Sequence, residues 1–247
     1  MSFINFSLFL FNFLLRFFKH DVFLVNMQIS KIKRMIPERL YDELSKVISK
    51  LRPCQEKAIK AGMLSGRNLL VCTPTASGKT LIAELVMLKS ILEHKGKAIY
   101  IVPLKALANE KYKDFTAHYG HLCKIAIAIG DFDSQDAYLR NFDMIICTSE
   151  KLDSLIRHNT PWLRDVAVVI VDEIHLLNDP GRGPTLEVLI TLLRKLLEDV
   201  QVIGLSATIG NPDELAEWLG AELVEDNWRP VKLKQGVYFM GEIEFKK

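Results

Sequence analysis

Residues 68–80 read NLLVCTPTASGKT, and this stretch decides the fold of the chain. Residues 68–72 form a short, mainly apolar run without polar alternation, which is typical of a strand buried on both faces of a sheet. Small and hydroxyl residues follow, and from Lys79 apolar residues recur at helical spacing to about residue 94. The stretch therefore predicts a strand, a tight turn and a helix in succession.

The same alternation continues along the chain. Further apolar runs lie at residues 98–102, 125–129, 144–147, 166–171 and 202–205, and amphipathic segments at 104–119, 149–157, 184–198 and 212–219. Strands that are each followed by a helix predict an α/β fold, a doubly wound parallel sheet with helices on both faces. We expect its ligand at the carboxyl ends of the strands, where the loops enter the helices.

Composition sets the broad class of the protein. The 247 residues are 49% hydrophobic and 25% charged, which excludes a disordered or collagen-like chain. With 32 basic and 30 acidic residues, the net charge of +2 neither demands nor excludes nucleic acid. The four cysteines form no Cys-x-x-Cys pair, so we expect reduced, buried thiols in a cytoplasmic protein; they are Cys54, Cys72, Cys123 and Cys147.

The first 26 residues differ from the rest, because they hold eight of the 13 phenylalanines. Their apolar run, residues 3–15, is shorter than the roughly 20 residues that span a bilayer. A signal peptide fits poorly, since no basic segment precedes the run. A hydrophobic anchor, an added packing helix and a mis-assigned start remain open. We favour the last, with the true protein beginning at Met27 and having no membrane contact.

The turn at residues 73–80 predicts a phosphate site, although Thr73 stands where the usual P-loop pattern has its first glycine. Backbone N–H groups of the turn and of the helix N-terminus converge on phosphate oxygens, and Gly78 lets the backbone approach closely. Lys79 supplies a positive charge, and the Thr80 hydroxyl is a ligand for Mg²⁺. The expected ATP-binding residues are Thr73, Pro74, Thr75, Ala76, Ser77, Gly78, Lys79 and Thr80.

Two acids follow a later strand, where residues 166–171 end in Asp172-Glu173-Ile174-His175. A carboxylate at the end of a neighbouring strand is where the Mg²⁺ partner of a P-loop belongs. We expect Asp172 to hold the metal and Glu173 to orient the attacking water. Adjacent acids are costly without a compensating cation, which argues against a purely structural role. Ser206-Ala207-Thr208 ends the next strand, and alone it is typical of an ordinary loop.

With these elements in order, the chain resembles the first motor domain of a superfamily 2 helicase, a RecA-like P-loop NTPase domain. The Asp-Glu-x-His sequence resembles the DExH box, and Ser-Ala-Thr resembles motif III. The other matching segments are Arg52-Pro53-Cys54-Gln55 (Q motif), residues 102–108 (motif Ia), Gly130-Asp131 and residues 148–153 (motif Ib). Within the superfamily, the pattern is similar to archaeal DNA-repair helicases related to the helicase part of polymerase theta. The resemblance covers roughly residues 27–247.

The resemblance implies roles for further residues. Gln55 would read the adenine edge. Hydroxyls of Ser206 and Thr208 would hydrogen-bond the loop that ends at His175. The state of the bound nucleotide would then alter how tightly the domain holds a nucleic-acid strand. The implied contacts to a strand's phosphates are Pro103, Lys105, Thr148 and Lys151; ordinary surface lysines are the alternative for two of these. The implied activity is ATP-dependent movement, 3′ to 5′, along single-stranded or forked DNA.

The resemblance also implies a second RecA-like lobe, which carries arginine fingers. We interpret residues 27–235 as the ATP-binding domain and 236–247 as the truncated start of the link to that lobe. The lobe is then lost with a truncated or split gene, or supplied by another polypeptide, and the chain alone binds ATP-Mg²⁺ but hydrolyses it poorly. Two alternatives stay open: an RNA helicase fragment, and a remnant that binds nucleic acid in an ATP-dependent way without hydrolysis.

Overall fold

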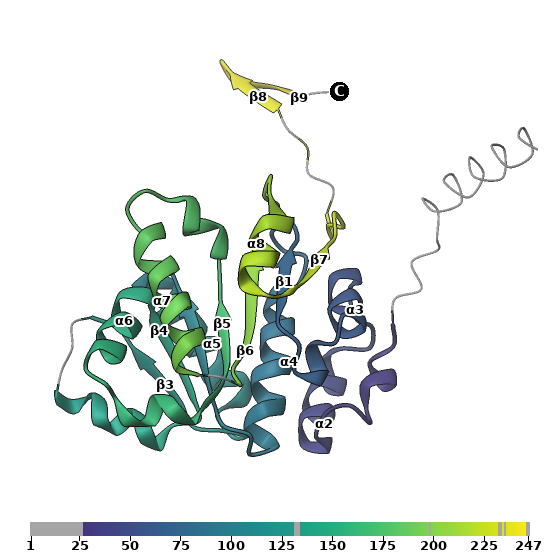
Figure 1. Ribbon diagram of the computed structural model, residues 1–247. Helices are drawn as coiled ribbons and strands as arrows, with labels where there is room; N and C mark the ends of the chain where they lie inside the picture. Colours follow the sequence, from purple (N-terminus) through teal and green to yellow (C-terminus); the bar gives the residue numbers. More distant parts are fainter. Residues whose placement is uncertain (1–26, 131–133, 198, 232–233, 235, 246–247) are drawn as a thin grey trace, which may run out of the picture.

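The computed structural model describes residues 27–130, 134–197, 199–231, 234 and 236–245 (Figure 1). The hydrophobic segment 1–26 and Asp131 lie outside these residues, so the interpretations given for them stay predictions. Across the described ranges, no helix is long and apolar enough to cross a membrane.

Seven parallel strands form the central sheet, in the spatial order β3-β4-β2-β5-β6-β1-β7. The strands are β1 (Leu69–Cys72), β2 (Lys97–Val102), β3 (Ile125–Ala128), β4 (Met144–Thr148), β5 (Val166–Val171), β6 (Gln201–Ser206) and β7 (Glu222–Glu225). Six of them correspond to the predicted apolar runs, which confirms the parallel α/β fold. The seventh was not predicted, because β7 is a short edge strand with a glutamate at each end.

Helices cover both faces of the sheet (Figure 1). They are α2 (Glu38–Val47), α3 (Pro53–Lys60), α4 (Lys79–Leu92), α5 (Lys105–Tyr119), α6 (Ser149–Arg157), α7 (Gly183–Leu196) and α8 (Pro212–Leu219). Short 3₁₀ turns are η1 (Ile29–Ile32), η2 (Met63–Ser65), η3 (Ser134–Asn141), η4 (Pro161–Asp165) and η5 (Ile174–Asn178).

Alternate strand residues serve two separate cores. On β2, for example, Tyr100 packs with the helices α2 to α5, whereas Ile99 and Ile101 pack on the other side with α6, α7 and α8. This follows from the two-residue period of a strand, since successive side chains point to opposite faces. Because both faces are covered, the strands carry apolar residues at nearly every position.

A separate two-stranded hairpin, β8 (Gly236–Phe239) and β9 (Glu242–Phe245), stands away from the sheet (Figure 1). Its register pairs Tyr238 with Ile243 and Gly236 with Phe245, so one face of the hairpin is apolar. These three large side chains are 54–70% exposed. The interpretation of residues 236–247 as a link to a second lobe stays a prediction.

All four cysteines are buried and unpaired, as the sequence predicts. Burial raises the pKa of Cys72 to about 11 and the pKa of Cys147 to about 12. Such thiols stay protonated near neutral pH and behave as small apolar side chains.

Candidate nucleotide-binding site

Three turns meet at the carboxyl edge of the sheet. The P-loop (residues 73–80) follows β1, the acid turn (residues 172–175) follows β5, and a third turn (residues 206–208) follows β6. Strand β6 lies between β1 and β5, so the three turns are neighbours although the chain separates them widely. The P-loop and the two acids can act on one ligand only if their turns lie close together, and the order of the strands brings them together.

The P-loop is held by hydrogen bonds within itself. The hydroxyls of Thr73 and Ser77 lie 2.7 Å apart, and both residues are buried. The Ser77 N–H donates to the Pro74 carbonyl at 3.2 Å. Thr73 therefore stabilises the turn through its hydroxyl, where the usual pattern has a glycine.

Gly78 joins the P-loop to helix α4 and has a φ of +102°. A Cβ at this position would lie 2.5 Å from Gln55 Nε2 and 2.9 Å from Arg52 Cδ. Glycine is thus needed here for two reasons: its backbone conformation has a positive φ, and side chains of helix α3 and its N-cap leave no space for a Cβ. The second reason could not be predicted from the sequence.

Helix α3 braces the P-loop through Gln55, which is 3% exposed. Gln55 Nε2 donates to the Gly78 carbonyl at 2.9 Å, and Oε1 accepts from the Arg52 N–H at 2.7 Å. Arg52 Nη1 also donates to the Ala76 carbonyl at 2.7 Å. Gln55 and Gly78 line a cavity of about 470 Å³, together with Leu81 and Glu84. The base-reading role of Gln55 stays a prediction, because its amide already serves the P-loop.

Lys79 folds back over the P-loop. Its Nζ donates to the carbonyls of Thr73 and Pro74, at 2.8 Å and 3.3 Å. Burial lowers the pKa of Lys79, while the nearby carboxylates of Glu173 and Asp172 act in the opposite direction. The ammonium group is thus held among acceptors that phosphate oxygens can replace.

Asp172 is fixed by three hydrogen bonds. Its N–H donates to the Ile101 carbonyl at 2.9 Å, and Oδ1 accepts from the Glu173 N–H at 3.0 Å. Oδ2 accepts from the Tyr100 hydroxyl at 2.6 Å. Burial, and then the charge of Asp172, raise the pKa of Tyr100 well above its usual value, so this hydroxyl remains a donor. Sequence reasoning missed Tyr100.

Glu173 adopts a left-handed backbone, with φ 53° and ψ 42°. A non-glycine residue rarely takes this conformation, and such strain concentrates at functional turns. Its side chain is about 40% exposed, and Oε2 lies 3.4 Å from His175 Nδ1. Glu173 therefore presents its carboxylate at the open side of the acid turn.

The contact between the acid turn and the third turn differs from the expected one. The Ala207 N–H donates to His175 Nδ1 at 3.4 Å. The Ser206 hydroxyl is buried and makes no hydrogen bond to the acid turn among the described residues, and Thr208 is exposed. A backbone group of motif III, and not the hydroxyls of Ser206 and Thr208, joins the two turns in this structure.

The oxygen donors expected for Mg²⁺ fit that cation. No group of three or more His, Cys, Asp or Glu side chains suited to a metal occurs in the part of the chain that the structure describes. Thr80 and Asp172 supply a hydroxyl and a carboxylate, and Mg²⁺ is commonly held by one or two carboxylates plus substrate phosphates. Lys111 Nζ, which sequence reasoning also missed, lies 3.5 Å from Thr80 Oγ1.

The expected nucleic-acid contacts fall into two groups. Pro103 and the exposed Lys105 lie where β2 passes into α5, and Pro103 lines a small cleft with Asp172 and Glu173. Thr148 caps α6 by accepting from the Lys151 N–H at 3.4 Å. Lys151 is only 2% exposed. Its expected contact with a strand is therefore corrected, because α6 turns this side chain inward.

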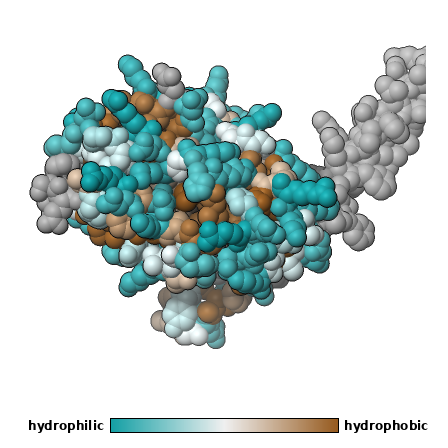
Figure 2. Space-filling view, turned by 90° about the horizontal axis from the view of Figure 1, so that it is seen from below, coloured by the Kyte–Doolittle hydropathy of each residue, from teal (hydrophilic) through white to brown (hydrophobic). Residues whose placement is uncertain are grey.

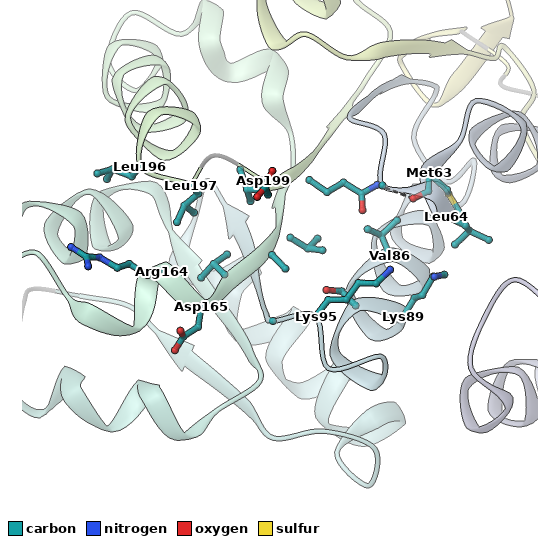
Figure 3. A pocket seen from close by; sticks show the side chains of 18 residues that line it. Met63, Leu64, Val86, Lys89, Lys95, Arg164, Asp165, Leu196, Leu197 and Asp199 are labelled. Atoms are coloured by element: carbon teal, nitrogen blue, oxygen red, sulfur yellow. Dashed lines mark hydrogen bonds between the residues drawn. The ribbon is translucent and has the colours of Figure 1, made fainter.

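A cavity of about 850 Å³ lies at the opposite edge, where the strands begin (Figure 3). The face of the molecule seen from below is mostly hydrophilic, with hydrophobic patches (Figure 2). Lys89 and Lys95 both pair with Glu93, at 2.6 Å and 2.8 Å. Arg164 lies across the cavity from them (Figure 3). The two lysines thus share one carboxylate, and Arg164 lies apart from them.

The sequence matches the DEAD/DEAH box helicase family over residues 52–215. It is 52% identical over 211 residues to the ATP-dependent DNA helicase Hel308 of Pyrococcus abyssi (strain GE5 / Orsay), covering 85% of this chain and 28% of that protein. Identity to the Hel308 of Methanocella arvoryzae is 54% over 206 residues, covering 81% and 28%. The DUF1998 helicase MrfA bound to DNA has a similar structure, with a TM-score of 0.69, 28% identity and coverage of 78% and 30%. The chain thus spans about 28% of the length of these Hel308 relatives.

Proposed function

The chain belongs to the DEAD/DEAH box helicase family, and on that basis we propose that it is the ATP-binding, ATP-hydrolysing motor half of a cytoplasmic 3′–5′ DNA helicase. The observation that carries the proposal is the meeting of the P-loop and the acid turn at one edge of the sheet. The names of the Hel308 relatives support DNA as the polymer and ATP as the fuel.

The residues divide the work of hydrolysis. Lys79 exchanges the carbonyls of Thr73 and Pro74 for β- and γ-phosphate oxygens, and the N–H groups at the start of α4 face the same phosphates. Thr80 and Asp172 hold Mg²⁺, which when bound neutralises charge on the phosphates. Glu173 orients the attacking water from the open side of the acid turn.

Coupling to nucleic acid uses the neighbouring turns. Lys105 and Thr148 lie at the starts of α5 and α6, where side chains and N–H groups hold phosphates without reading bases. The Ala207–His175 hydrogen bond links the acid turn to motif III. Glu173 Oε2 lies 3.4 Å from the same Nδ1 atom of His175, so a change in the position or charge of Glu173 is felt at the His175 ring that contacts the third turn.

A second RecA-like lobe completes the motor in this proposal, either later in a longer protein or on a separate polypeptide. The greater length of the Hel308 relatives leaves room for it. Residues 236–245 would begin the connection. Because arginine fingers accelerate hydrolysis by about 10³–10⁵-fold in systems where they are known, the chain by itself should bind ATP and turn it over slowly.

The test is Glu173→Gln, assayed with single-stranded DNA and enzyme in excess over ATP. The variant should keep its affinity for ATP and lose roughly 10²–10⁴-fold in phosphate release, because the amide cannot accept the water's proton. Glu187→Gln on the exposed side of α7 is the matched control and should change neither quantity. Equal phosphate release by the wild type and Glu173→Gln would refute the assignment.

A further inference from the structure

Asp172 receives one hydrogen bond from the chain on each carboxylate oxygen. Oδ1 accepts from the Glu173 N–H, and Oδ2 accepts from the Tyr100 hydroxyl at 2.6 Å. A carboxylate offers about four acceptor positions, so two remain for a cation and its waters. The two donors thus fix the plane of the carboxylate and leave acceptor positions for a ligand.

Tyr100 is built to hold its hydroxyl in one place. It is fully buried on β2, between β4 and β5. Its ring meets Phe115 of α5 edge to face, with centroids 5.4 Å apart and an interplanar angle of 83°. A ring packed in this way cannot swing its hydroxyl away from Asp172 without disturbing the core.

A second buried tyrosine, Tyr119, also donates its hydroxyl to a carboxylate, and it provides a comparison for Tyr100. The Tyr119 hydroxyl donates to Glu84 Oε2 at 2.9 Å, also in the layer between the sheet and its helices. That bond satisfies a buried hydroxyl, but neither partner belongs to the acid turn. The same chemistry at Tyr100 instead ends on the carboxylate assigned to the metal.

We propose that Tyr100 is a positioning residue that orients the Asp172 carboxylate for Mg²⁺, acting through Oδ2. This inference rests on the proposed function and deepens it. Groups that hydrogen-bond to a metal ligand commonly change metal affinity by about 10–100-fold when they are removed. Tyr100 thus acts on the magnesium requirement through Asp172, to which it donates a hydrogen bond, and not as a ligand itself.

The experiment compares Tyr100→Phe with wild type by calorimetric titration of ADP, at a series of Mg²⁺ concentrations and in EDTA. The variant should need roughly tenfold more Mg²⁺ for half-maximal tightening of ADP binding. Its affinity in EDTA should be unchanged, because the P-loop is untouched. Tyr119→Phe removes the same kind of bond from Glu84 and should leave the Mg²⁺ requirement at the wild-type value.

Further outcomes separate the possible failures. Equal weakening of ADP binding with and without Mg²⁺ would show a purely structural role and overturn the proposal, as would a wild-type Mg²⁺ requirement in Tyr100→Phe. Adding Tyr100→Phe to Asp172→Asn should have no further effect, and an additive loss would also overturn it. A wild-type chain that binds ADP without any dependence on Mg²⁺ would refute the proposed function itself, and this inference with it.

Discussion

The two edges of the central sheet both carry charged side chains, yet they differ in what these charges meet. At the carboxyl edge, Lys79 bonds the P-loop and faces acids from a different turn. At the amino edge, Lys89 and Lys95 both pair with the carboxylate of Glu93, which lies just after the end of α4. Helix α4 directs its N–H groups to the first edge and its last carbonyls to the second, which favours anions at one and cations at the other.

This difference teaches that helix polarity, and not cavity volume, identifies the nucleotide edge. The amino-edge cavity of about 850 Å³ exceeds the one of about 470 Å³ beside Gln55. The presence of Lys89 and Lys95 there is nevertheless explained without a ligand, because both lysines pair with Glu93 and lie near the C-terminal end of α4, which favours cations.

The largest effect is expected for Lys79→Ala. Loss of a partly buried cation that faces phosphate should weaken ADP binding roughly 100-fold, since truncating one member of such a charge pair costs about 2–5 kcal/mol. Calorimetric titration in Mg²⁺ measures it. A loss of less than about threefold would contradict the contrast between the edges.

A smaller effect is expected for Gly78→Ala, compared with Gly66→Ala at the amino edge. Both glycines have positive φ, but a Cβ at Gly66 would meet nothing within 4 Å, whereas at Gly78 it would displace Gln55. The free energy of unfolding should fall by about 2 kcal/mol for Gly78→Ala and about 1 kcal/mol for Gly66→Ala. Urea denaturation measures the difference. Equal losses of unfolding free energy in the two variants would contradict the conclusion that Gln55 packs tightly against Gly78 and supports the P-loop.

The smallest effect is expected for Lys95→Ala. Its pair with Glu93 is exposed, with 60% of the lysine side chain accessible. Stability should change by less than about 0.5 kcal/mol, and the affinity for ADP should not change measurably. Lys79→Ala in the same titration supplies the positive control. A tenfold loss of ADP affinity in Lys95→Ala would indicate that the nucleotide binds at the amino edge, and would contradict the assignment to the carboxyl edge.

Much of this architecture was predictable, because buried parallel strands carry continuous apolar runs and their carboxyl ends must share an edge. Contacts across the sheet were not. The Tyr100 hydroxyl donates to Asp172, 72 positions away in the sequence. The apolar run around Tyr100 contains no pattern that predicts this partner. The burial of Lys151 did leave a signal, since it occupies the same helix face as Leu152 and Leu155, both fully buried.

The hairpin β8–β9 has a practical consequence for handling the chain. Two strands alone are marginally stable in water, and both outer edges of this pair offer unpaired backbone groups. With Tyr238, Ile243 and Phe245 exposed beside those edges, concentrated solutions should form strand-to-strand aggregates. Ending an expressed version at Pro230 should therefore raise solubility and improve crystals, while leaving nucleotide binding intact.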